Sequence, residues 1–176
     1  MDILPYQLKP IQFLPYDVNL SKVAELVSRI IIEQIPGARP EHIGSTAVVG
    51  MPGKNIINLV IPSGLDQFEA RLQVLSKIGF QESPLNKSEP SYRPLRVASI
   101  KYQNKIYNIH VHLIVEGSDD LAGARFFRNY LIEHPQEQKR YAEIKQEAVS
   151  QGKTDATSYN AAKEPFIRAV LAKMMN

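Results

Sequence analysis

The chain has 176 residues, 44% of them hydrophobic and 22% charged, with a formal net charge of +3 and no cysteine. This composition is typical of one soluble globular domain, and the lack of cysteine excludes a disulfide scaffold, a thiolate zinc site and a cysteine nucleophile. No segment approaches the roughly 18 uninterrupted apolar residues of a membrane span, and the start does not read as a signal peptide. We therefore expect a cytoplasmic protein without a membrane partner.

The first half of the chain predicts alternating helices and strands. Three prolines within residues 1–16 argue against a regular helix and indicate an extended arm. Hydrophobic periodicity then predicts, in order, a helix over 19–34, a short strand near 39–43, a strand over 55–61, a helix over 66–78, and a pair of strands at 95–102 and 106–115. The apolar run at 55–61 suits a strand covered on both faces, and Pro62 is expected to end it.

The second half predicts helices to the end. They are expected over residues 119–133, 135–150 and 157–175, with Pro135 in a first helical turn. There is no internal repeat and no long linker. The sequence therefore predicts one domain over 1–176, with an α/β half at 1–117 and a helical half at 118–176.

Basic residues are concentrated in one segment, 86–108. It contains Lys87, Arg93, Arg96, Lys101 and Lys105 against the single acid Glu89. Such a segment is either the solvated face of a hairpin or a positive rim that attracts phosphates. It lacks the interleaved aromatics and dense basic runs typical of nucleic-acid binding, so nucleic acid is not expected as a partner.

A Gly-Ser pair, Gly44 and Ser45, follows the short strand and opens a loop of small residues. Such a turn lets the backbone approach a ligand and offers amide and hydroxyl donors to a phosphate, although it is also an ordinary turn. The loop ends at Lys54, but its glycine spacing differs from that of a P-loop, so a Walker-type ATPase is not expected. The strand that follows carries an amide, Asn58, within its apolar run.

Several motifs occur in the order typical of one family. The segment HIGSTAVVGMPGKNIINLVI at 42–61 resembles that family's signature, GSTAVPGLxxKPxID followed by an apolar tail. Later pieces agree in order: HVH at 110–112, FFRNYLIEHP at 126–135, YAEIK at 141–145 and YNAAKEPFI at 159–167. On these motifs, which span nearly the whole chain, the protein resembles the GrpB family.

The resemblance implies a fold and a class of ligand. GrpB proteins resemble nucleotidyltransferases, which implies an α/β (α+β) fold, with a small mixed β-sheet flanked by helices and a helical C-terminal part. GrpB-like domains also occur fused to dephospho-coenzyme A kinases. The expected partner is therefore a phosphorylated small molecule, either a nucleotide or a compound related to coenzyme A.

The resemblance also implies a site. In nucleotidyltransferases a Gly-Ser turn holds the triphosphate, and two acids one residue apart on the following strand bind divalent cations. The phosphate-binding positions correspond here to Gly44, Ser45, Thr46 and Lys54. The two acid positions correspond to Asn58 and Val60, and neither is an acid.

Three asparagines depart from the family's usual pattern. Asn58 and Asn129 stand where aspartate is usual, and Asn55 stands where proline is usual. An amide keeps the shape of a carboxylate and discards its charge, which favours a site that binds without metal chemistry. Asn58 has a second interpretation, in which its amide only bridges to a neighbouring loop or helix.

His110 and His112 lie two residues apart in a predicted strand, so they share one face with Asn108. As candidate metal ligands they suit a divalent ion such as zinc, manganese or nickel, and when protonated they suit phosphate. They are equally interpreted as packed, hydrogen-bonded residues. No third metal ligand follows from the spacing, so any cofactor stays uncertain.

The helical half supplies further candidates that match family positions. They are Arg128, Tyr130, Lys145, Tyr159 and Lys163. Each is alternatively a solvated residue or a side chain lying along an amphipathic helix. We take Arg128 and Lys163 as the candidate phosphate ligands of this half.

Three functions stay open from the sequence. The first is binding of a phosphorylated small molecule or nucleotide, with weak or lost metal-dependent transferase activity. The second is an active nucleotidyltransferase-like enzyme that uses a metal held by His110 and His112, with Asn58 as a neutral ligand. The third is a non-catalytic adaptor whose helical half binds a protein partner.

Overall fold

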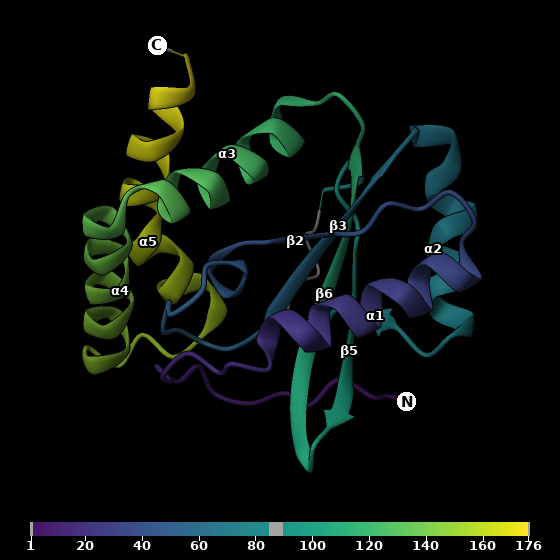
Figure 1. The fold of residues 1–176 in the computed structure, drawn as a ribbon, viewed down its shortest axis with the longest axis horizontal. Helices are drawn as coiled ribbons and strands as arrows, with labels where there is room; N and C mark the ends of the chain where they lie inside the picture. Colours follow the sequence, from purple (N-terminus) through teal and green to yellow (C-terminus); the bar gives the residue numbers. More distant parts are fainter. Residues whose placement is uncertain (1, 85–89, 176) are drawn as a thin grey trace.

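The computed structural model describes residues 2–84 and 90–175, and a mixed β-sheet is at its centre (Figure 1). The strands are β1 (Ile3–Leu4), β2 (Glu41–Ile43), β3 (Ile57–Ser63), β4 (Gln81–Glu82), β5 (Leu95–Tyr102) and β6 (Lys105–Val115). Their order is β1-β5-β6-β3-β2, and β4 also pairs with β5. The β3–β6 pair is parallel and the other described pairs are antiparallel. The expected small mixed sheet is confirmed.

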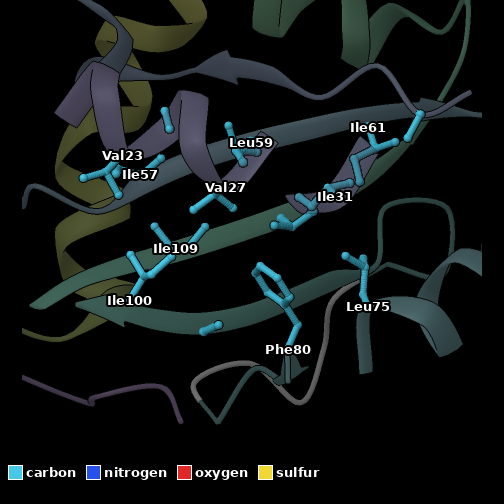
Figure 2. Packing of buried hydrophobic residues seen from close by; sticks show 14 of the residues in the cluster. Val23, Val27, Ile31, Ile57, Leu59, Ile61, Leu75, Phe80, Ile100 and Ile109 are labelled. Atoms are coloured by element: carbon cyan, nitrogen blue, oxygen red, sulfur yellow. The ribbon is translucent and has the colours of Figure 1, made fainter. Parts of the chain in front are cut away.

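The main hydrophobic core lies on one face of this sheet. Helices α1 (Leu20–Gln34) and α2 (Phe68–Lys77) cover that face. Every second residue of β3 and β6, such as Ile57, Leu59 and Ile109, packs against them because side chains alternate between the faces of a strand (Figure 2). The apolar stripe of α1 that meets these strands includes Val23, Val27 and Ile31.

The C-terminal part is helical. It contains α3 (Asp119–Glu133), α4 (Pro135–Ser150) and α5 (Ala156–Leu171), which gather beyond the β2 edge of the sheet in Figure 1. The side chains of Ser118 and Asp155 accept hydrogen bonds from the backbone at the starts of α3 and α5, as good N-caps do. None of the helices in the described part of the chain is long and apolar enough to cross a membrane.

Most predicted elements are confirmed to within two residues. β3 continues through Pro62, contrary to expectation. The antiparallel strand β2 begins opposite Val60, so beyond that residue β3 is paired, within the described part of the chain, with β6 alone, and a proline is tolerated. The last helix ends at Leu171 and is followed by a 3-10 turn, Ala172–Met175. The two-residue strands β1 and β4 were not predicted, because they are too short to leave a periodic pattern.

The basic segment is partly neutralised by acids. Lys105 forms an ion pair with Asp17, and Nη2 of Arg96 lies 3.5 Å from a carboxylate oxygen of Glu82. Lys87 and Glu89, on which the expected positive rim also depends, lie outside the described residues. The described pairs favour a solvated hairpin over a continuous positive surface.

The core packing predicts a large loss of stability on truncation. Ile109 is 1% exposed, so Ile109→Ala should lower the free energy of unfolding by roughly 2–5 kcal/mol through lost burial and a residual cavity. Ile32 lies on α1 but is 47% exposed, so the control Ile32→Ala should change it by less than about 1 kcal/mol. Urea unfolding monitored by circular dichroism measures both variants, and equal losses would contradict the assigned core.

Candidate functional site

The turn after β2 requires a glycine. Gly44 has φ 71° and ψ −169°, a conformation essentially restricted to glycine. A Cβ atom here would lie 3.7 Å from Nδ2 of Asn58. Ser45 follows as the first residue of a short 3-10 turn. The fold therefore brings the Gly-Ser pair next to Asn58.

The loop from this turn to β3 is anchored in the helical half. Val48 and Met51 are 2% and 1% exposed and belong to a hydrophobic cluster built by α3, α4 and α5. Gly53 exchanges two backbone hydrogen bonds with Leu14 of the N-terminal arm, with N···O distances of 2.8 and 2.9 Å. The loop is thus held between the arm and the helices, which fixes the position of Lys54.

Lys145 of α4 is a buried cation beside this loop. It is 2% exposed, and its ammonium donates a hydrogen bond to the carbonyl oxygen of Pro52. A Cβ atom at Gly53 would lie 3.0 Å from Nζ of Lys145 and 3.7 Å from Oγ of Ser45. Glycine at this position therefore lets the ammonium and the hydroxyl approach the same small region.

Two further lysines contact the ring of Tyr159, a residue of α5 that is 1% exposed. Nζ of Lys54 lies 5.2 Å from the ring centroid and Nζ of Lys163 lies 4.5 Å from it, both within cation–π range. We call Lys54, Lys145 and Lys163 the lysine cluster. None of the ion pairs formed within residues 2–84 and 90–175 involves a member of this cluster.

Burial and mutual repulsion lower the pKa values of the lysine cluster. Burial, with the charge of Lys54, lowers the pKa of Lys145 to about 7. Burial, with the charges of both other lysines, lowers the pKa of Lys163 to about 7, and burial lowers the pKa of Lys54. The three amines are therefore close enough to repel one another, and an anion between them would be attracted by all three.

The opposite face of the sheet from the main core is polar and holds the N-terminal arm. The phenol oxygen of Tyr6 lies 2.9 Å from Nε2 of His110. The backbone N–H of Gln7 donates to Oγ of Ser99 at 2.9 Å, and the Gln7 carbonyl accepts from Nδ2 of Asn108 at 2.8 Å. These polar side chains share one face, as predicted for His110 and Asn108, and each has a partner in the arm.

The two histidines on this face are neutral at physiological pH. Burial, with the charge of Lys54, lowers the pKa of His110 to about 3. Burial, with the charges of Arg93 and His110, lowers the pKa of His112 to about 3. Nδ1 of His112 is buried without a hydrogen-bond partner among the described residues. Within that part of the chain, no three or more histidine, aspartate or glutamate side chains form a group that could hold a metal.

The residues around Asn58 do not fit a magnesium ion, which usually needs one or two carboxylates. Nδ2 of Asn58 donates to the carbonyl of Ile56 at 3.1 Å, and Val60 is fully buried among apolar side chains of β2, β6 and α3. Glu41, paired in register with Val60, is bound by two nitrogens of the Arg125 guanidinium, and this hydrogen bonding lowers the pKa of Glu41. Its carboxylate is therefore already engaged.

Two other expected ligand residues have structural partners. Oγ1 of Thr46 lies 3.0 Å from Nε2 of His42 and donates to the carbonyl of Ile56 at 3.2 Å. Arg128 donates to the carbonyl of His42 at 3.0 Å and to Oδ1 of Asn129 at 2.9 Å. These contacts brace β2 against the loop and α3, whereas Lys54 and Lys163 lie together in the lysine cluster.

Lys145 is the site residue to which the sequence interpretation gave too little weight. It shares the buried face of α4 with Tyr141 and Ala148, at helical spacings of four and three residues. A lysine at an apolar position of an amphipathic helix is the signal that identifies it, because a lysine is rarely buried without a partner or a function. The contact of Tyr6 with His110 could not be predicted in this way, since the irregular arm has no periodicity.

The departure from the family's proline at Asn55 has a backbone reason. Asn55 has φ 55°, a value that a proline ring cannot adopt and that asparagine tolerates. Its Nδ2 donates to the carbonyl of Pro15 at 2.9 Å. The asparagine therefore helps to tie the arm to the loop that carries Lys54.

Together, the sheet order, the Gly-Ser turn beside β3 and the C-terminal helices define a nucleotidyltransferase-like fold. A solved structure of the Cid1 poly(U) polymerase is similar, with a TM-score of 0.51 and 16% identity, over 85% of this chain and 50% of that chain. At this identity the likeness concerns the fold alone. The chain itself belongs to the GrpB family, whose model, described as GrpB protein, matches residues 10–173. The resemblance read from the motifs is thereby confirmed.

A solved structure of a GrpB protein and two sequence relatives are also similar to this chain. The crystal structure of conserved protein GrpB from Enterococcus faecalis has a TM-score of 0.74 and 20% identity, over 94% of this chain and 100% of that chain. UPF0157 proteins of Pseudomonas aeruginosa and Streptomyces coelicolor are 26% and 27% identical over 80% and 76% of this chain. The match spans 57% of the length of the first of these proteins and 67% of the second.

The contacts of the arm predict that Asn108 holds it in place. Asn108→Ala removes the donor to the Gln7 carbonyl, so amide hydrogen exchange over residues 5–9 should become roughly fivefold faster, as expected for a lost hydrogen bond of about 1 kcal/mol. Gln73→Ala, which removes an exposed hydrogen bond on α2, is the control and should leave the arm unchanged. Unaltered exchange in Asn108→Ala would show that the arm is held elsewhere.

Proposed function

We propose that this protein binds a phosphorylated small molecule, such as a nucleotide or a compound related to coenzyme A, at the Gly-Ser turn and the lysine cluster. The binding needs no carboxylate-held metal ion, and metal-dependent phosphate transfer is weak or lost. The observation that carries the proposal is the convergence of three lysines without a carboxylate partner in the described part of the chain, one of which, Lys145, lies near the hydroxyl of Ser45.

The charge of the site supports an anionic ligand. Lys54 comes from the loop before β3, Lys145 from α4 and Lys163 from α5. Ion-paired lysines would be neutralised by their partners. These three instead repel one another in the free protein when protonated, so an anion that lies between them stabilises their charged form. Phosphate oxygens suit this arrangement, since lysine binds them as a point charge and the Ser45 hydroxyl can donate a further hydrogen bond.

The polar face of the sheet supports binding in preference to metal-dependent catalysis. At the two positions where the resemblance to nucleotidyltransferases implies acids, the chain has Asn58 and the buried Val60. A divalent ion there would lose the Coulomb attraction that two carboxylates supply. No step of phosphate transfer can be derived through a metal held by these residues.

Nucleotides should stabilise the protein without magnesium. With EDTA present, ATP or coenzyme A at about a hundred times its Kd should raise the melting temperature by roughly 5 °C or more, because the ligand binds the folded state alone. Lys54→Met should weaken binding about tenfold, the equivalent of 1.4 kcal/mol. Lys22→Met, which removes an exposed lysine from α1, is the matched control. A stabilisation that appears only with magnesium, or a clear transfer product, would contradict the proposal.

Restoring the acid should restore a metal site. Asn58→Asp places a carboxylate beside Gly44, so with ATP present this variant should bind Mg²⁺ about tenfold or more tightly than the unaltered protein. Asn104→Asp adds the same charge at the β5–β6 turn and should have no effect. Calorimetric titration measures all three proteins. Equal Mg²⁺ affinity in the unaltered protein and in Asn58→Asp would mean that Asn58 is not at the ligand.

A further inference from the structure

With its three amines protonated, the lysine cluster carries more positive charge than one phosphate group needs. Among the described residues, the other ionisable side chains beside it are Tyr141 and Tyr159, from α4 and α5, whose rings contact the lysines, and His110, from β6. Burial raises the pKa of each tyrosine and lowers the pKa of His110, so all three are neutral at physiological pH. No negative charge on these groups balances the lysines.

Within the described part of the chain, the backbone supplies one hydrogen-bond acceptor to the lysine cluster. The carbonyl of Pro52 accepts from Lys145, whereas the ammoniums of Lys54 and Lys163 contact the π-face of Tyr159. An ammonium has three donors, and a ring face satisfies them less well than anionic oxygens do. Several donors are therefore left for a ligand with many oxygens spread along its length.

Resting on the proposed function, we infer that the lysine cluster binds a chain of two or three phosphates, and that protons taken up on binding supply the positive charge that a metal ion would otherwise provide. Three amines from three elements can contact successive phosphates of such a chain, whereas a single phosphate can approach only part of the cluster. The ligand class is a nucleoside diphosphate or triphosphate, or another diphosphate ester.

The proton uptake follows from the charge state of the free cluster. The pKa values of Lys145 and Lys163 are about 7, so above that pH most molecules hold these amines neutral. A bound polyphosphate stabilises the ammonium form, raises both pKa values and draws protons from solution. Affinity should therefore fall as pH rises above about 7.

The folding stability of the free protein depends on pH with the opposite sign to the ligand affinity. Between pH 7 and 10 the unfolded chain binds more protons at Lys145 and Lys163 than the folded chain does. Folding stability of the free protein consequently rises with pH across this window. A ligand that needs the charged amines thus binds best where the free site is least stable.

Calorimetry with AMP, ADP and ATP tests the inference. The titrations are made at pH 8, where the phosphates of the probes are ionised, with EDTA and in buffers of different ionisation enthalpy. We expect ATP to bind about tenfold or more tightly than AMP, with uptake of about one proton or more per ATP. AMP binding as tightly as ATP, or ATP binding without proton uptake, would overturn the inference and leave the proposed function standing. Failure of all three nucleotides to bind would overturn the inference, and the failure of coenzyme A to bind as well would overturn the proposed function.

Two variants separate this site from general charge effects. Lys163→Met removes one amine of the cluster, so it should weaken ATP binding more than AMP binding and reduce the proton uptake. Lys139→Met removes an exposed lysine from α4, the helix that carries Lys145, and should change neither quantity. Equal effects of the two substitutions would also overturn the inference, because the response would then reflect net charge alone.

Discussion

The anchoring of the loop between β2 and β3 is the constraint on which the site depends. Val48 and Met51 bury their side chains among the C-terminal helices, while Gly53 is paired with the N-terminal arm. The loop carries Ser45 near one end and Lys54 at the other, so its docking sets the geometry between the sheet and the helices. Without this apolar contact, the loop would be held against the helices by polar contacts such as the hydrogen bond from Lys145 to the carbonyl of Pro52.

Electrostatics then supports the proposal that this chain binds its ligand without metal-dependent transfer. Positive charge is gathered in the lysine cluster, while β3 has an amide and a valine at the two positions where the resemblance implies acids. The acid that lies on the same face, Glu41, is held by Arg125. The neighbouring histidines are neutral, and His110 forms a hydrogen bond with Tyr6 of the N-terminal arm. Under the proposed function, attraction of a negatively charged ligand is the property that the lysine cluster supplies.

Much of the fold was predictable because hydrophobic periodicity reports which side of an element is buried. The alternation around His110 and His112 correctly placed both on the face opposite the main core. The same reasoning failed at Pro62, because whether a proline is tolerated depends on which strand lies beside it. It also missed β1 and β4, whose pairing with β5 joins segments far apart in the chain.

The sequence by itself determined the family, the order of the long elements and the Gly-Ser turn, because motifs and periodicity are local properties of the chain. Only the tertiary structure decided the environment of each charge. Lys54, Lys145 and Lys163 are separated by many residues and meet through packing, whereas Arg128 is engaged by the β2 backbone. Burial and proximity, which set pKa values and leave donors free for a ligand, are produced by the assembled fold and have no signature in a single segment.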